Sequence, residues 1–402
     1  MDADEPFKKD SLRKWAVLLV ASLLIFFVYM MQYQIASLAF LIIPQFNIDT
    51  VQLANLMLIP MLLAAALGIP LGFLADRFSV KLVVGVDLIV SVFGAYLRVG
   101  ASDYATALCS MLLLGFAPAA LNSNVIKLLG AWFETKTSVA IGIYYAFSGL
   151  GASAAMLSAS LIANTREAFL ASAIGLTVIL IAWWILVPEN KGIRGEAGRH
   201  SINSALTEPR SSWKYFAQAA KVQAVWIIAL ITGLGLASKT AYLGFLPTAL
   251  SETVGPEQSN ILASFVTYGG IVGCAMGPAI CLKRKHPKAI LVAFAIAAAC
   301  LISASSFLLD NPSWILLFVV GMSTSVTAPI VEAIPAALPS LHGCVGSAGG
   351  IIGTVSLMMS YALPIIITAI SESNMQMLVI LTGACFLLTV PLIALLPKPE
   401  TT

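Results

Sequence analysis

The feature that most limits the fold of this chain is its series of long apolar runs separated by short polar turns. Hydrophobic residues occupy 59% of its 402 positions and charged residues only 10%, and the mean hydropathy is +0.94. A water-soluble fold cannot bury that much apolar surface, whereas a helix of roughly 20 apolar residues crosses a bilayer. The runs predict an all-α integral membrane protein with twelve membrane-spanning helices, near residues 15–43, 51–75, 81–101, 104–131, 137–163, 167–188, 222–250, 258–282, 287–308, 313–339, 344–370 and 374–397.

The positions of the lysines and arginines predict how these spans are oriented. If both termini are cytoplasmic, the cytoplasmic segments hold eighteen of these residues and the opposite segments hold two, Arg98 and Arg166. This bias matches the excess of positive charge that cytoplasmic loops carry. The remaining two, Lys127 and Lys239, fall inside predicted spans. We therefore expect both termini in the cytoplasm and, because loops and tails are short, a bacterial inner membrane.

One long polar segment separates the sixth predicted span from the seventh. It divides the chain into an expected N-terminal six-helix bundle (1–188), a cytoplasmic linker loop (189–221) and a C-terminal six-helix bundle (222–402). The halves are also related in sequence, because GIPLGFLADR from Gly68 has a degenerate counterpart, GCAMGPAICLKRK, from Gly273. Two related six-helix halves are typical of transporters that alternate access around a site near the bilayer midplane.

The charged turn between the second and third spans carries a recognisable motif. Gly68 to Lys81 reads GIPLGFLADRFSVK, and Asp76 is expected to cap a helix end at the membrane surface. The run G-x-x-x-D-R-x-x-x-K resembles the signature loop between helices 2 and 3 of the major facilitator superfamily, which usually has glycine where this chain has Ser79. The resemblance implies a secondary transporter of two pseudo-symmetric bundles, with coupling or gating roles for Asp76, Arg77 and Lys81.

A second stretch narrows this resemblance. The sequences WF at 132–133, SVAIG at 138–142 and FSGLG at 147–151 look like the helix 4–5 region of the superfamily's anion and carboxylate branches. Those branches include nitrate, cyanate and oxalate porters, so the resemblance implies a small anionic substrate. In the superfamily, spans 1, 4, 7 and 10 line the central cavity.

Lys239 is the deepest cation in the predicted spans. It lies near the middle of the seventh span, where an ionisable side chain costs roughly 2.5–3.5 kcal/mol on insertion scales and therefore requires a function or a partner. Thr232, Gly235 and Tyr242 share its helical face and form a polar stripe. One interpretation is a cation that attracts an anionic substrate, with Tyr242 beside it. The other is a structural ion pair that holds two helices together.

Three more ionisable residues lie within predicted spans. Lys127, in the fourth span, is a substrate or gating residue, or a lysine whose ammonium reaches the interface. Glu332, in the tenth span, corresponds to Lys127 at the repeat offset and pairs with it as a cytoplasmic gate, or else carries a proton. Asp87, in the third span, supports the loop at Asp76 and Arg77, or couples transport.

Polar residues at helical spacing complete the candidate substrate site. The first span has a polar cluster near its centre, and tyrosines elsewhere can offer hydroxyls and ring faces to a ligand. Packing is the alternative interpretation for each tyrosine. The candidates beside Lys127, Lys239 and Tyr242 are Tyr29, Gln32, Tyr33, Asn124, Tyr145, Tyr268 and Tyr361.

Together these features predict a secondary active transporter for a small organic anion, most simply a carboxylate, coupled to H⁺ or working by anion exchange. Efflux of hydrophobic or cationic compounds is the alternative, and a membrane receptor without transport is a third. An enzyme is not expected, because the chain has no nucleotide-binding loop and its three histidines fall in turns. Its six cysteines lack metal-ligand spacing. We expect no cofactor, metal or nucleic acid, and a monomer in the lipid bilayer.

Overall fold

The structure is a computed structural model of the whole chain. It describes residues 5–133, 137–162, 164–188, 212–281, 287–341, 344–372 and 374–396. Within these ranges the regular elements are all helices. In the same ranges, eleven helices are long and apolar enough to cross a membrane. A shorter apolar stretch, Tyr104–Ala120, lies in the one remaining predicted span, the fourth.

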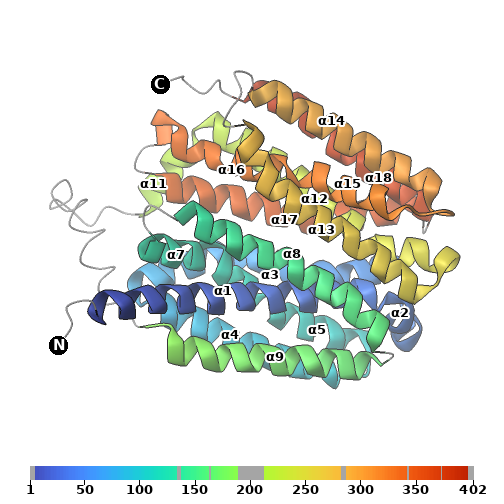
Figure 1. The fold of residues 1–402 in the computed structure, drawn as a ribbon, viewed down its shortest axis with the longest axis horizontal. Helices are drawn as coiled ribbons and strands as arrows, with labels where there is room; N and C mark the ends of the chain where they lie inside the picture. The colour runs from blue at the N-terminus through green and yellow to red at the C-terminus, as the bar shows by residue number, and fades with distance from the viewer. Residues whose placement is uncertain are drawn as a thin grey trace.

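The first six spans form one bundle, the lower one in Figure 1. A short helix, α2 (Ala39–Phe46), joins the first span to the second. The spans themselves are α1 (Glu5–Ser37), α3 (Thr50–Arg77), α4 (Val80–Val99), the broken span α5–α7, α8 (Thr137–Leu161) and α9 (Thr165–Leu186).

The fourth span is not one continuous α-helix. It consists of α5 (Tyr104–Leu114), α6 (Phe116–Ala120), the π-helical turn η1 (Leu121–Val125) and α7 (Ile126–Phe133). Gly115 interrupts it where the chain packs closely on α3, since a Cβ there would lie 2.8 Å from the carbonyl oxygen of Pro60. Wide π-helical turns of this kind are common at functional sites.

The last six spans form the second bundle, the upper one in Figure 1. A helix from the predicted linker, α11 (Ser212–Ala220), packs against α17 of this bundle. The spans are α12 (Gln223–Val254), α13 (Pro256–Cys281), α14 (Pro287–Ser305), α15 with α16 (Trp314–Ser325, Thr327–Ala337), α17 (Val345–Ser371) and α18 with α19 (Met375–Leu387, Thr389–Leu395).

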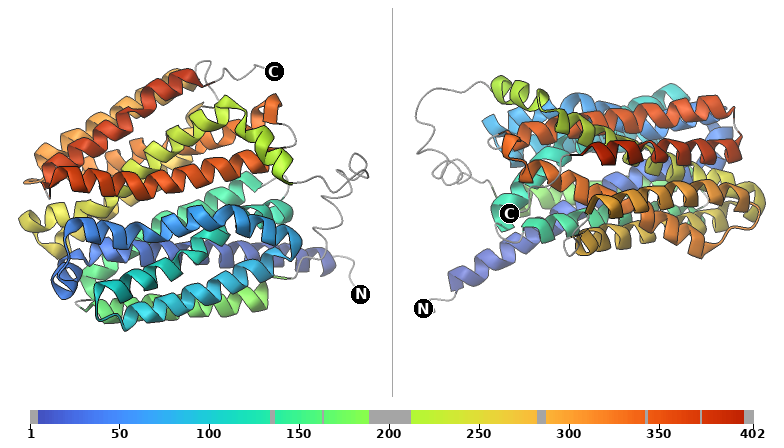
Figure 2. Two further views of the ribbon diagram at one scale, coloured as in Figure 1. Left: turned by 180° about the vertical axis from the view of Figure 1, so that it is seen from behind. Right: turned by 90° about the horizontal axis from the view of Figure 1, so that it is seen from above.

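The helices run roughly parallel, so the molecule has two ends, and the three views agree on this arrangement (Figures 1 and 2). The helix α1 begins and α19 ends at the same end, on the left of Figure 1, while α2 lies at the other. The two bundles meet along two helix pairs, α3 with α17 and α8 with α13. A further contact between the bundles joins α1 to α12.

Small residues set how closely the helices pack inside each bundle. The backbone of α8 at Gly151 lies against the carbonyl group of Phe26 in α1, and that of α15 at Gly321 lies against Val266 in α13. Any side chain at either position would overlap the neighbouring backbone. The outer surface carries exposed large apolar side chains, such as Phe93, Ile185 and Phe307, as expected for contact with lipid tails.

The motif between the second and third spans is described in part. The helix α3 continues to Arg77, so Asp76 lies in its last turn, and the residue that caps the start of α4 is Ser79. The hydroxyl of Ser79 accepts a hydrogen bond from the backbone N–H of Leu82 at 3.2 Å. Ser79, and not Asp76, is therefore the residue that caps the start of α4, while a cap by Asp76 at another helix end stays a prediction. A hydroxyl suits this position because serine is a favoured N-cap residue.

Candidate functional site

Lys239 lies in the middle of α12 with a single hydrogen bond. Its ammonium Nζ donates to Ser325 Oγ, at the end of α15, over 2.9 Å. It also approaches α13, where a Cβ on Gly270 would lie 3.4 Å from Nζ. The side chain is half-buried, and no carboxylate of the described residues forms an ion pair with it. An ammonium group has three donors, so the described contacts use only one of them.

Two tyrosines of α1 lie across from α12. The rings of Tyr29 and Tyr33 stack with centroids 6.3 Å apart. A side-chain hydrogen bond links Tyr33 to Thr240, the residue after Lys239. The predicted pair of α1 tyrosines therefore faces the helix that carries Lys239.

Glu332 faces the space between the two bundles. It is exposed although it lies on the membrane-spanning helix α16. Its carboxylate is nevertheless close enough to interact electrostatically with Tyr29 in α1 and Tyr145 in α8. Tyr145 is itself 37% exposed, and its ring lies 5.3 Å from that of the buried Tyr144. Glu332, Tyr29 and Tyr145 therefore lie close together across the bundle interface, where Glu332 and Tyr145 are exposed.

The structure places two of the predicted tyrosines outside this group. The hydroxyl of Tyr242 donates to Ser305 Oγ at 2.9 Å inside the second bundle, where Tyr242 is only 2% exposed. The hydroxyl of Tyr361 donates to Asn55 Oδ1 at 2.9 Å and so joins α17 to α3. Tyr242 thus belongs to the interior of one bundle, and Tyr361 to the contact between bundles.

Three other predicted site residues form no described contact with Lys239. Gln32 and Asn124 are buried, and Gln32 Nε2 and Asn124 Oδ1 have no hydrogen-bond partner. The amide nitrogen of Asn124 reaches the carbonyl oxygen of Leu71 at 3.4 Å. The ring of Tyr268 packs edge-on against Phe265.

The other predicted coupling residues, apart from Glu332, lie in the first bundle. Asp87 is buried in α4, and one of its carboxylate oxygens lacks a hydrogen-bond partner. Lys81 donates to the carbonyl oxygen of Trp184 at 2.8 Å and so ties the start of α4 to α9. The side chains of Asp76, Arg77 and Lys127 lie outside what the structure describes. The proposed pair between Lys127 and Glu332 remains a prediction.

The two bundles are bonded to each other at the end of the molecule that carries α2, which we call the closed end. Asn260 Nδ2 donates to the carbonyl oxygen of Ser37 at 3.0 Å. The Tyr361–Asn55 bond lies toward the same end of the two bundles. Nearer the middle, the hydroxyls of Ser153 and Thr267 join α8 to α13.

At the opposite end, which we call the open end, the same helices part. On α8, Gly149 packs against α13, where a Cβ would lie 2.8 Å from Ile271 Cγ1. Gly142, two turns earlier on the same face, has no atom within 4 Å of its Cβ position. The same holds for Gly349 and Gly353 in α17. Gly68 in α3 likewise has no neighbouring atom within 4 Å of its Cβ position.

Three residues that the structure places at bundle contacts or in a bundle core were missed by sequence reasoning. Asn55 and Asn260 join the bundles at the closed end, and both are polar residues inside predicted spans. Arg98 was counted in an outside segment, but it lies in the last turn of α4 with its side chain 2% exposed. In the sequence, this buried contact was indicated only by an arginine and Gln34 standing within otherwise apolar runs.

Among the described residues, no group of three or more His, Cys, Asp or Glu side chains is arranged to hold a metal ion. Among these residues, the candidate site brings Lys239 of α12, Glu332 of α16 and tyrosines of α1 and α8 to the region where the two bundles face each other. A site near the midplane between two bundles is the arrangement of secondary transporters.

Comparison with known proteins agrees with this architecture. The sequence model described as the Major Facilitator Superfamily matches residues 22–364. The chain belongs to that superfamily of membrane transporters. The crystal structure of the E. coli fucose:proton symporter FucP aligns with a TM-score of 0.64 at 14% identity, over 95% of this chain and 98% of that one. No curated protein sequence matches the chain. The likeness to FucP, at this identity, shows the fold alone.

Proposed function

We propose that this protein is a secondary active transporter for a small organic anion, with Lys239 as the cationic contact for a substrate carboxylate. The observation that carries the proposal is the half-buried ammonium group, which has one neutral hydrogen-bond partner, Ser325 Oγ, in the middle of a membrane-spanning helix. An uncompensated charge at that depth is costly. A bound carboxylate would supply both the opposite charge and charge-assisted hydrogen bonds.

The surroundings of Lys239 also suit a carboxylate of small size. Tyr33 is linked to α12 one residue beyond Lys239, and Tyr29 stacks on Tyr33. Tyrosine hydroxyls donate hydrogen bonds to oxygen atoms, and their rings pack against a short carbon chain. Efflux of cationic compounds is disfavoured, because a cation in the site would face Lys239.

Glu332 is the best-placed residue for coupling to H⁺. It lies in open space between the bundles and close to Tyr29 and Tyr145 of the opposite bundle. Movement of the bundles would therefore change its surroundings and hence its proton affinity. The E. coli protein in the structural comparison is described as a proton symporter, but the H⁺ coupling proposed here rests on the placement of Glu332, and anion exchange is the alternative.

The difference between the two ends supports alternating access. We propose that the open end is the cytoplasmic one, because the predicted cytoplasmic segments carry eighteen lysines and arginines. The described conformation would then face the cytoplasm, and rocking of one bundle against the other would expose the site to the other side. The two halves, divided near 189–221, would move as units in a monomer in a bacterial inner membrane.

The test is ligand-induced thermal stabilisation of the purified protein by mono- and dicarboxylates, sugars, amino acids and cationic drugs. For wild type, we expect only carboxylates to raise the melting temperature. Lys239→Gln should weaken binding at least tenfold, as expected when a charged hydrogen bond worth roughly 1.5–3 kcal/mol is lost. Ser325→Ala is the matched control, because it removes the partner of Lys239 but keeps the ammonium group, and it should retain carboxylate binding.

Two results would contradict the proposal. The first is equal stabilisation of wild type and Lys239→Gln by sugars or cationic drugs, which would make Lys239 structural. The second is binding of carboxylates by Lys239→Gln as tightly as by wild type. Coupling is tested separately in proteoliposomes, where Glu332→Gln should retain substrate binding but lose uptake driven by a pH gradient.

A further inference from the structure

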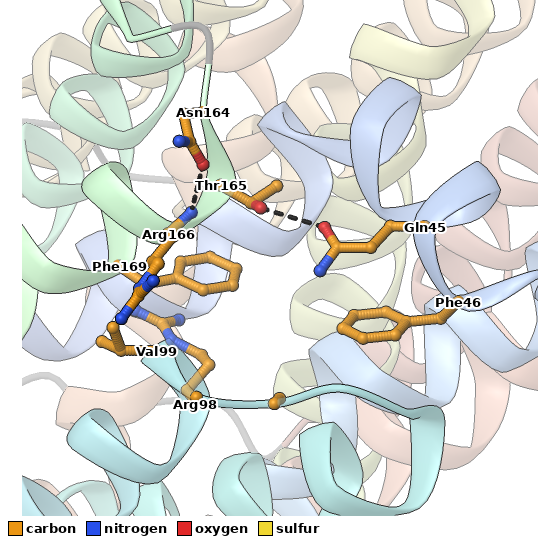
Figure 3. A pocket seen from close by; sticks show the side chains of 10 residues that line it. Gln45, Phe46, Arg98, Val99, Asn164, Thr165, Arg166 and Phe169 are labelled. Atoms are coloured by element: carbon orange, nitrogen blue, oxygen red, sulfur yellow. Dashed lines mark hydrogen bonds between the residues drawn. The ribbon is translucent and has the colours of Figure 1, made fainter.

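A cavity at the closed end of the first bundle is lined only by residues of that bundle, whereas Lys239 lies in the second. Its volume is about 500 Å³. It lies where three connections meet: Gln45 and Phe46 at the end of α2, residues 98–101 at the end of α4, and residues 164–166 at the start of α9. Figure 3 shows Arg98, Arg166 and Phe169 along one wall, with Gln45 and Phe46 on the opposite side.

Arg98 supplies a buried positive charge to this wall. One guanidinium nitrogen donates to the carbonyl oxygen of Met31 at 2.7 Å. The other donates to Gln34 Oε1 at 2.9 Å and Ser172 Oγ at 3.0 Å. The guanidinium carbon lies 4.0 Å from the centre of the Phe169 ring. All these partners are neutral, so the charge of Arg98 is not balanced by any carboxylate hydrogen-bonded to it.

Arg98 also keeps an unused donor. Its Nε has no hydrogen-bond partner although the side chain is only 2% exposed. A buried guanidinium N–H is rarely left without an acceptor, because leaving a charged group unsatisfied is costly. An anion in the adjoining pocket, which Arg98 lines, would balance the charge of the guanidinium group.

The rest of the pocket has the same electrostatic sign. Arg166 is exposed and lines the pocket, and the pocket adjoins the N-terminus of α9, whose first turn is capped by Asn164 Oδ1. None of the ten lining residues has a carboxylate side chain. The nearby Asp103 already accepts hydrogen bonds from the backbone and hydroxyl of Thr106. Helix N-termini and paired arginines both favour anions.

We propose that this pocket is a second anion site, which binds a carboxylate- or phosphate-bearing group between Arg98 and Arg166. Arg166 contacts the anion directly from the solvent side, and Arg98 supplies charge from beneath. The group comes either from a soluble anion or from a phospholipid headgroup at this membrane surface. The site does not depend on the function proposed for Lys239, which lies in the other bundle.

The experiment measures thermal stability of the full-length protein in lipid nanodiscs. In one arm the lipid is neutral phosphatidylcholine, and phosphate or oxalate is titrated at constant ionic strength. In the other arm no anion is added, and anionic phosphatidylglycerol replaces part of the lipid. Arg166→Gln is the test variant, because Arg166 is exposed and its loss leaves the fold intact. Glu167→Gln, the next residue, is the control that removes a charge of opposite sign.

A soluble-anion site predicts that phosphate or oxalate raises the melting temperature in the first arm. Arg166→Gln should weaken that binding roughly tenfold, the loss of one charged hydrogen bond, and Glu167→Gln should keep or strengthen it. A headgroup site predicts stabilisation in the second arm only, with the same dependence on Arg166. Lys239→Gln should leave the phosphate response and the headgroup response unchanged, whereas it would weaken any oxalate response that arises at Lys239.

The proposal is overturned if neither arm stabilises the protein, or if Arg166→Gln responds like wild type. Arg98→Lys provides a second variant that keeps the charge but loses the forked donors. If Arg98 only holds α1, α4 and α9 together, each of the variants Arg98→Lys and Arg98→Gln should lose the same stability with anion as without it. If Arg98 serves the site, the stabilisation that the anion adds should be smaller in Arg98→Gln than in Arg98→Lys.

Discussion

The two ends of the molecule differ in how the bundles meet, although the same pairs of helices run along both. At the closed end, Asn260 bonds to Ser37 and Tyr361 bonds to Asn55 across the interface. At the open end, the face of α8 that touches α13 at Gly149 has no neighbour at Gly142. The helices are therefore in contact over part of their length and apart over the rest.

This difference shows how the closed end is held. The hydrogen bonds described across the interface at this end are neutral, namely Asn260 to Ser37 and Tyr361 to Asn55. The bond between Ser153 and Thr267, nearer the middle, is neutral too. Each such bond contributes only about 0.5–1.5 kcal/mol net. A contact of this strength holds one state while allowing a ligand to shift the population to another. A strong ion pair at this place would make opening slower.

The largest expected effect comes from adding a side chain to one of two glycines that share a face of α8, Gly142 and Gly149. In Gly149→Leu the new side chain would overlap Ile271, since even a Cβ lies 2.8 Å from its Cγ1. Overpacking of this kind costs about 1–3 kcal/mol. In Gly142→Leu the side chain enters open space, and leucine forms helix better than glycine by under about 1 kcal/mol. Thermal unfolding should show a lower melting temperature for Gly149→Leu only.

Transport distinguishes the two variants in a second way. Gly142→Leu should stay folded yet transport slowly, because the leucine would obstruct closure of the open end. Substrate flux in proteoliposomes measures this. If Gly142→Leu transports at the wild-type rate while remaining stable, then the open end does not close along this face, and the comparison of the two ends fails.

The next effect is on chemical reactivity. In a background with the native cysteines replaced, Gly142→Cys and Gly349→Cys should react readily with a bulky water-soluble maleimide. At both positions, no neighbouring atom lies within 4 Å of where a Cβ would be. Ser153→Cys, which lies where α8 is bonded to α13, is the control and should react at least tenfold more slowly. Mass spectrometry of the labelled protein gives the rates. Equal rates at all three positions would show that the ends do not differ in solution.

Much of this architecture could be predicted from the sequence. Apolar run length fixes how many helices cross a bilayer, and the eleven long spans with the short Tyr104–Ala120 stretch match the twelve predicted runs. Run length did not predict the breaks at Gly115 and η1, because it carries no information on local packing such as that of Gly115 on α3. The superfamily was also identifiable, because its loop motif from Gly68 to Lys81 consists of adjacent residues.

The surroundings of single side chains were much less predictable. Helical spacing put Tyr242 on the face of Lys239, yet its hydroxyl bonds to Ser305 inside the bundle. A stripe spans a wide angle, and its edge residues point to different neighbours. Arg98 looked like a surface cation because it stands near a span end, whereas Met31 and Gln34 of α1 enclose it. Such partners are distant in sequence, and spacing along one helix carries no information about them.

A smaller effect is expected from weakening one bond of the closed end. Tyr361→Phe removes the hydroxyl that donates to Asn55, a loss of about 1 kcal/mol for the closed end, or about a fivefold shift in population. The maleimide reactivity of Gly142→Cys should fall accordingly, as the open end closes more often. Tyr104→Phe is the control, because its bonds to Asn55 and Gln52 stay within one bundle. An equal change in both variants would contradict a specific role for the contact across bundles.

The smallest expected effect concerns pH and stability at the closed end. The backbone N–H of Thr106, and then its hydroxyl, donate to Asp103 and lower the pKa of its carboxyl below the usual 3.8. Because the folded pKa is the lower one, this contribution is complete above the unfolded pKa and is lost as pH falls through the folded value. Asp103→Ala should therefore lower the melting temperature by the same small amount at pH 7 and pH 5, and by less below about pH 4. Asp103→Asn keeps the helix cap and should lower it less at neutral pH, whereas a deficit for Asp103→Ala that stayed unchanged down to pH 3 would show that the charge of Asp103 adds nothing to the cap.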